Sequence, residues 1–214
     1  MSIFNIIEHI RKRPGMYLGS SSITALSHFL HGYQAAESDY GLYRRGELIP
    51  LQFEYMSEFT KIKLNSKDNL GWCSHILKFC NGDEVKALNQ FFELYDEFIQ
   101  VRIKKYWKAV LTEKNIQWNN SMEHAYTMSE NGKKPIYENP IAVYVIELTI
   151  PAYVLAIETS NDMKLETQFF ASFEQAKGSH AIPPGAEVYF GKIDLWEEFS
   201  DGKIKFDKNK IISH

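Results

Sequence analysis

Four acidic residues near the C-terminal end of the chain surround aromatic side chains and suggest a binding surface. They are Asp194, Glu197, Glu198 and Asp201, with Trp196 and Phe199 among them. Complementary charge accelerates the encounter of two proteins, and an aromatic side chain buried on binding anchors the complex. We therefore predict a partner-binding site at Asp194, Trp196, Glu197, Glu198 and Asp201, suited to a basic partner such as a nuclease. The alternative is a solvated strand end whose aromatic side chains point into the core.

A histidine pair and a serine run in the N-terminal half have spacings that chemistry can use. His28 and His31 stand three positions apart, an acceptable spacing for two metal ligands on one helical face. No Cys, Asp or Glu neighbours them on that face, although Glu37 or a distant residue could add a third ligand, so we expect no metal site. The serines at 20–22 lack the G-x-S-x-G elbow of a nucleophile, and we expect them to cap a helix.

The stretch RKRPGMYLGS at residues 11–20 resembles the start of gyrase B-type ATPase domains. In that family the loop precedes a helix with a catalytic glutamate and, four residues later, a metal-binding asparagine. Counted from Gly19-Ser20, these positions fall on Gly32 and Ala36, whose side chains can neither activate water nor hold Mg²⁺. The adenine-binding D-x-G-x-G motif, a P-loop and a G-x-G-x-x-G motif are also missing from the sequence. We expect no nucleotide cofactor and no catalytic residues.

A second resemblance extends over most of residues 6–98. After RPGMYLGS come a serine-initiated helix that ends in FLHGY, then GW, then DEVKALNQFFELYDEF. Together these anchors are similar to a family of small bacterial proteins, some of them associated with toxin–immunity loci of contact-dependent inhibition. The resemblance implies a non-catalytic immunity protein that binds a cognate secreted toxin and neutralises it by occlusion. It supplies no catalytic residues.

Two other functions stay open. The first is an enzyme with an unrecognised active site, which a polar pocket with carboxylates of raised pKa would favour. The second is a structural subunit of a bacterial assembly, which a large exposed apolar patch would favour. We expect the protein not to be an enzyme.

Composition and charge narrow the class of protein. The chain has 214 residues, 44% of them hydrophobic, and a net charge of −3, which disfavours direct nucleic-acid binding. Residues 1–110 carry a balance of +2 and residues 111–214 a balance of −5. No apolar run approaches the roughly 18 residues that span a bilayer, and the start MSIFNIIEHIRKR reverses the order of a secretory signal. Cys73 and Cys80 read as free thiols, so we expect a cytoplasmic protein without membrane contact.

The periodicity predicts an α+β protein. We expect a helical region over residues 1–112, followed by an α+β region over 120–214 with a mainly antiparallel sheet and one or two helices. The alternative is that both regions pack as one continuous domain. Helices are expected at 2–13, 20–37, 52–64 and 71–79, and from Asp83 to Tyr106, with a Pro14-Gly15 corner after the first. Further along, we expect residues 141–160 to form two strands, or one long strand with a bulge or edge position at Pro151. We also expect a helix over 163–177 and strands at 187–196 and 203–207.

Overall fold

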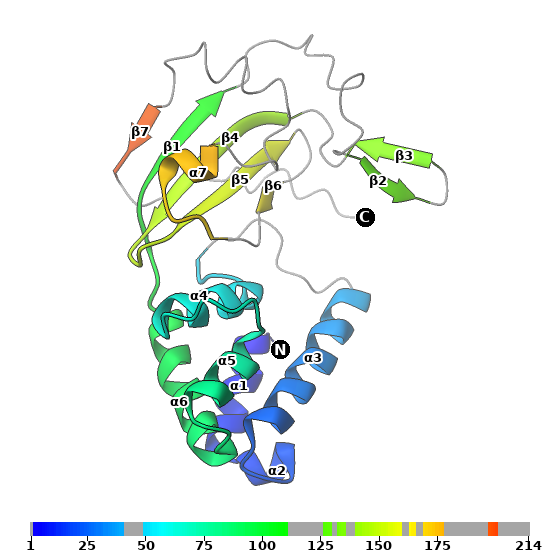
Figure 1. The fold of residues 1–214 in the computed structure, drawn as a ribbon. Coiled ribbons are helices and arrows are strands. Elements are labelled where there is room, and N and C mark those ends of the chain that lie inside the picture. Colours follow the sequence, from blue (N-terminus) through cyan, green and yellow to red (C-terminus); the bar gives the residue numbers. More distant parts are fainter. Residues whose placement is uncertain are drawn as a thin grey trace. The chain divides into compact units, whose positions relative to one another are not determined.

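The computed structural model describes residues 2–40, 49–110, 126–129, 132–135, 140–159, 163–165, 169–177 and 197–200. The chain divides into two compact units, Met1–Val101 and Arg102–His214. Helices form the first unit, and an antiparallel sheet is the main feature of the second (Figure 1). The α+β class predicted from the sequence is confirmed.

The first unit is built from helices that follow one another along the chain. They are α1 (Ile3–Lys12), α2 (Pro14–Leu18), α3 (Ile23–Asp39), the 3₁₀ turn η1 (Phe53–Tyr55), α4 (Met56–Lys63), α5 (Trp72–Phe79) and α6 (Glu84–Phe98). The helices expected at 2–13, 20–37, 52–64 and 71–79 are therefore confirmed. No helix within the described residues is long and apolar enough to cross a bilayer.

The starts of α1 and α6 are each capped by the side chain that precedes the helix. The Ser2 hydroxyl accepts a hydrogen bond from the backbone N–H of Asn5 at 3.4 Å. The Asp83 carboxylate accepts from the N–H groups of Val85 and Lys86 at 3.1 and 2.9 Å. Each cap satisfies amides that have no partner inside the helix.

The stretch at residues 11–20 stops one helix and starts another. Helix α1 ends at Lys12, as expected before Pro14, and α2 begins on Pro14. Proline suits this first helical position because its missing N–H has no intrahelical partner there. The predicted Pro-Gly corner is wrong, since Gly15 lies inside α2. The left-handed residue is Gly19, with φ of 69°, and its N–H bonds the carbonyl oxygen of Gly15 at 3.2 Å.

Helix α6 supplies the centre of the helical core. Its buried side chains are Ala87, Leu88, Phe91, Leu94, Tyr95 and Phe98. The ring of Phe91 is fully buried, and its centroid lies 4.8 Å from that of Trp72 and 6.0 Å from that of Tyr95. Phe98 meets Phe59 of α4 edge-on at 5.3 Å. Aromatic contacts thus join α4, α5 and α6 along the apolar face of α6.

The helix predicted from Asp83 to Tyr106 is wrong beyond Phe98. Helix α6 ends there, and residues Ile103–Val110 form strand β1. Strand β1 pairs antiparallel with β4 (Pro140–Leu148), placing Trp107 opposite Val145. Pairing with a distant strand overrides the three-four spacing that continues into this segment, because β propensity depends strongly on tertiary context.

The second unit contains a five-stranded antiparallel sheet with the order β6-β5-β4-β1-β7. Its remaining strands are β5 (Tyr153–Thr159), β6 (Met163–Leu165) and β7 (Glu197–Phe199). A separate hairpin joins β2 (Tyr126–Ser129) and β3 (Gly132–Pro135). Strands β4 and β5 flank the turn that holds Pro151, so the first of the two interpretations of residues 141–160, two strands, is confirmed.

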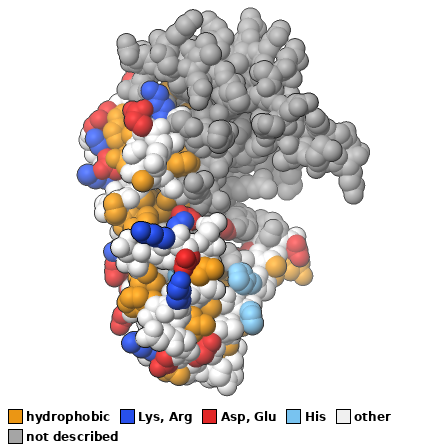
Figure 2. Space-filling model, in the orientation of Figure 1, with side chains coloured by type: hydrophobic (Ala, Val, Ile, Leu, Met, Phe, Trp, Pro, Cys, Tyr) orange, Lys and Arg blue, Asp and Glu red, His pale blue; other side chains and the backbone are white. Residues whose placement is uncertain are grey.

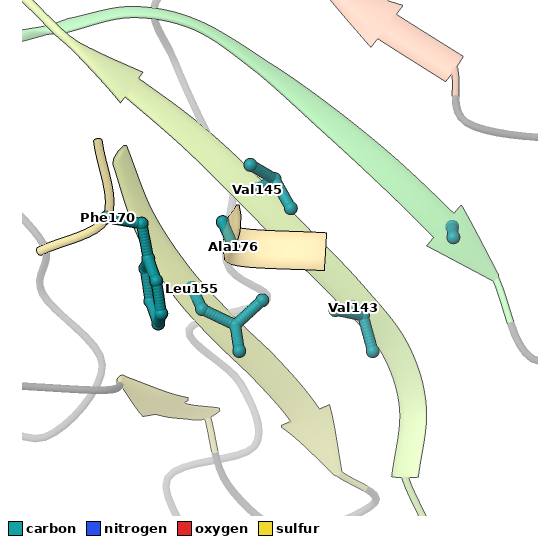
Figure 3. Close-up of a cluster of buried hydrophobic side chains, with 6 residues drawn as sticks. Val143, Val145, Leu155, Phe170 and Ala176 are labelled. Atoms are coloured by element: carbon teal, nitrogen blue, oxygen red, sulfur yellow. The ribbon is translucent and has the colours of Figure 1, made fainter. Parts of the chain in front are cut away.

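A short helix packs on one face of this sheet. Helix α7 (Phe173–Lys177) contributes Ala176 to a buried cluster with Phe170 and with strand residues Ala109, Val143, Val145 and Leu155. Figure 3 shows Ala176 and Phe170 on the side of β4 and β5 that carries Val143, Val145 and Leu155. The alternation of side chains along each strand places these residues on a common face.

The helix predicted over 163–177 is mostly wrong. Met163–Leu165 is strand β6, and Phe170 exchanges two backbone hydrogen bonds of 2.9 Å with Tyr153. Among the described residues of this range, only Phe173–Lys177 is helical. The expected strands at 187–196 and 203–207 lie outside the described residues.

Candidate functional site

Two of the predicted partner-binding residues lie on strand β7. Glu197 stands opposite Lys108 of β1, and Glu198 stands opposite Trp107, and both glutamates are exposed. Successive residues of a strand point to opposite faces, so the two carboxylates lie on different sides of the sheet. The other three predicted residues, Asp194, Trp196 and Asp201, lie outside the described residues.

Strand β7 is held to β1 by an aromatic contact. The ring of Phe199 stacks on that of Tyr106, with centroids 4.9 Å apart and an interplanar angle of 10°. The Tyr106 ring in turn lies 6.1 Å from that of Tyr144 on β4. Phe199 therefore packs against the sheet, as the alternative interpretation of a strand end expected, while the neighbouring carboxylates remain exposed.

The two carboxylates of β7 differ in how far their charge is compensated. Glu198 lies 3.4 Å from the ammonium of Lys105, which also lies 3.9 Å from Glu147 and 4.6 Å from the centroid of the Trp107 ring. Among the described residues, Glu197 has no ion-pair partner within 4.0 Å. The charge of Glu197 is thus the more available of the two to an approaching cation.

A polar triad occupies the sheet face opposite α7. The Tyr144 hydroxyl donates to Glu158 at 2.6 Å, and the Lys108 ammonium lies 3.7 Å from the same carboxylate. Burial and the hydrogen bond to this carboxylate raise the pKa of Tyr144, so the phenol stays protonated at neutral pH. Sequence reasoning missed this triad because its members come from three strands, and only the register brings Lys108 opposite Tyr144.

A second group of carboxylates lies in the helical unit. Burial raises the pKa of Glu54 on η1, and the charge of Glu37 on α3 raises it further. Burial and the same Glu37 charge raise the pKa of Tyr33. Two carboxyl groups whose environments separate their pKa values can serve as acid and base in catalysis. No sequence motif marks this pair, because its members are 17 positions apart on different elements.

Glu84 connects the start of α6 with the start of α3. Its carboxylate accepts from the hydroxyls of Ser22 and Thr24, each at 2.7 Å, and from the Thr24 N–H at 3.0 Å. These hydrogen bonds, led by that of the Thr24 hydroxyl, lower the pKa of Glu84. The Ser22 hydroxyl also accepts from the N–H of Ala25 at 3.1 Å, so this serine caps α3 as predicted.

The two histidines with metal-ligand spacing, His28 and His31, are both exposed on α3. Within the described part of the chain, no group of three or more His, Cys, Asp or Glu side chains is placed to hold a metal ion. Cys73 and Cys80 are free thiols, and burial raises the pKa of both. A raised pKa keeps a thiol protonated and weakly nucleophilic at neutral pH.

A buried histidine on α5 is the least satisfied polar side chain of the helical core. His75 is 3% exposed, and neither Nδ1 nor Nε2 has a hydrogen-bond partner among the described residues. A buried polar group without a partner costs about 1–3 kcal/mol relative to its hydrated state. The imidazole therefore opposes the stability of the helical unit.

Replacing His75 with leucine is expected to raise the free energy of unfolding of the helical unit by about 1 kcal/mol, because an apolar side chain of similar size removes the unsatisfied nitrogens. Urea denaturation followed by circular dichroism measures the change. His28→Leu, at an exposed position, is the control and should stay within about 0.5 kcal/mol of the unmodified protein. A loss of stability in the His75 variant would show that the imidazole has a partner in solution.

On the face of the helical unit that is visible in Figure 2, acidic and basic side chains are interspersed with apolar ones. No single sign of charge dominates that surface.

Comparison of the chain with protein-family models, with curated proteins and with solved structures finds no match to any of them. The similarity of residues 6–98 to immunity-associated bacterial proteins therefore remains an expectation from the sequence.

Proposed function

We propose that this protein is an immunity protein that binds a secreted protein toxin and neutralises it by occlusion. The observation that carries the proposal is the pair of exposed carboxylates, Glu197 and Glu198, on an outer strand of the described sheet. Phe199 stacks on Tyr106 and fixes the strand, so the carboxylates project from a defined backbone. The resemblance of residues 6–98 to immunity-associated proteins supports the same function.

To neutralise a toxin by occlusion, an inhibitor needs a surface that is complementary to the toxin in shape and charge. It needs no catalytic residues of its own. A toxin that cleaves nucleic acid needs a cationic surface for the phosphate backbone. An acidic strand is attracted to that surface, accelerates the encounter and disfavours partners of the wrong charge. Because Lys105 lies beside Glu198, Glu197 contributes more of this attraction. Such a protein acts in the cytoplasm, where it meets a toxin that has entered the cell.

Co-expression with a toxin gene from the same locus tests the proposed function. We expect the two proteins to co-purify, and we expect cells that express both to grow while cells that express the toxin alone do not. If the proteins neither co-purify nor protect the cells, the proposed function is wrong. A complex that forms without protection would point to the structural subunit of an assembly.

Reversing both charges of β7 in the double variant Glu197→Lys/Glu198→Lys is expected to weaken toxin binding by about tenfold. Attraction to a basic surface becomes repulsion, while the fold loses only an exposed ion pair worth at most about 1 kcal/mol. Isothermal titration calorimetry with the purified toxin measures the affinity.

The matched control for this variant is Asp39→Lys/Glu93→Lys, which changes the net charge equally at exposed positions of the helical unit. Its affinity for the toxin should stay within about twofold of the unmodified protein. Equal loss in both variants would indicate an effect of net charge alone, and no loss in either would exclude β7 from the contact.

A second candidate function is an enzyme that uses the carboxylates of the helical unit. The raised pKa of Glu54 beside the charge of Glu37 is the specific observation in its favour. Glu54 would donate a proton, and Glu37 would act as base or stabilise developing positive charge. Cleavage of glycosidic bonds or hydrolysis of nucleotides are reactions that such a pair performs.

A screen of glycoside and nucleotide substrates tests the enzyme hypothesis. Any hydrolysis that belongs to this site should fall at least about 100-fold in Glu54→Gln and in Glu37→Gln. It should persist in the control Glu58→Gln, on α4. Activity that survives the first two substitutions would come from elsewhere in the chain or from a contaminant.

A further inference from the structure

We draw no further inference here: the strongest candidate, the buried imidazole of His75 on helix α5, has ring nitrogens without a partner among the described residues, but nothing in the structure shows which ligand or charged group they would meet.

Discussion

Replacing Phe91 with alanine is expected to lower the free energy of unfolding of the helical unit by about 4 kcal/mol. The ring is fully buried between Trp72 and Tyr95, so its removal forfeits the transfer free energy of a phenyl group and leaves a cavity. If the surrounding aromatic rings relax into the cavity, the cavity becomes smaller. The loss of unfolding free energy then lies nearer about 3 than about 5 kcal/mol. Urea denaturation gives the free energy, and hydrogen exchange within α6 assigns it to the helical unit.

The matched control is Phe79→Ala, at the end of α5. This phenylalanine is 54% exposed, so the same chemical change removes little buried surface. Its free energy of unfolding should stay within about 0.5 kcal/mol of the unmodified protein. Equal losses at the two positions would contradict the packing of α6 described above, because burial alone distinguishes them.

Replacing Glu84 with alanine is expected to cost about 2 kcal/mol of the free energy of unfolding. The hydroxyls of Ser22 and Thr24 and the amide of Thr24 lose a charged acceptor at once. Part of this loss is recovered because water reaches the partly exposed start of α3. Hydrogen exchange of the first turn of α3 should rise with the loss of stability, although the substitution lies on another helix.

The contribution of Glu84 should also depend on pH. Its pKa is lower in the folded protein than in the unfolded chain, where a glutamate titrates at about 4.3. The stabilisation is therefore fully present above about pH 5 and is lost as pH falls through the folded pKa. The difference in free energy of unfolding between the unmodified protein and Glu84→Gln should be constant from pH 7 to about 5.5 and shrink toward pH 3.

The control for this titration is Glu93→Gln, at an exposed position of the same helix. Glu93 accepts a side-chain hydrogen bond from Gln90 at 3.1 Å on an exposed surface. Its substitution should change the free energy of unfolding by less than about 0.5 kcal/mol at every pH. If the difference for Glu84→Gln stayed constant down to pH 3, the ionised carboxylate would not be the group that stabilises α3.

Features that depend on near neighbours in the chain could be predicted from the sequence. The caps at Ser2 and Asp83 reach only three residues ahead, and Pro14 ends α1 through its own ring. Features that depend on partners far away in the chain could not be predicted from the sequence. Strand β1 forms because β4 pairs with it, and nothing in residues 103–110 identifies that partner. The bond from Ser22 to Glu84 spans 62 positions.

The candidate site, too, could be predicted from the sequence only where it depends on near neighbours in the chain. Glu197 and Glu198 are exposed on β7, as charged side chains usually are, while the acidic partner-binding surface stays a prediction. The ammonium of Lys105, which offsets one of these charges, could not be predicted from the sequence. Glu37 with Glu54, and Lys108 with Tyr144 and Glu158, also converge from separate elements. Their arrangement follows from packing and strand register and has no local signature.

Strand β7 pairs with β1 although Lys105 and Glu198 are 93 positions apart in the chain. A ribosome that adds 5–20 residues per second therefore releases β1 roughly 5 to 20 seconds before its partner. Once β4 has paired with β1, the edge of β1 that β7 covers in the finished fold stays open to strands of other chains until β7 has been made. A premature stop before residue 197 would leave this edge permanently uncovered. The truncated protein would then associate with itself through this edge. We therefore expect late truncations to cause aggregation in the cell as well as loss of binding.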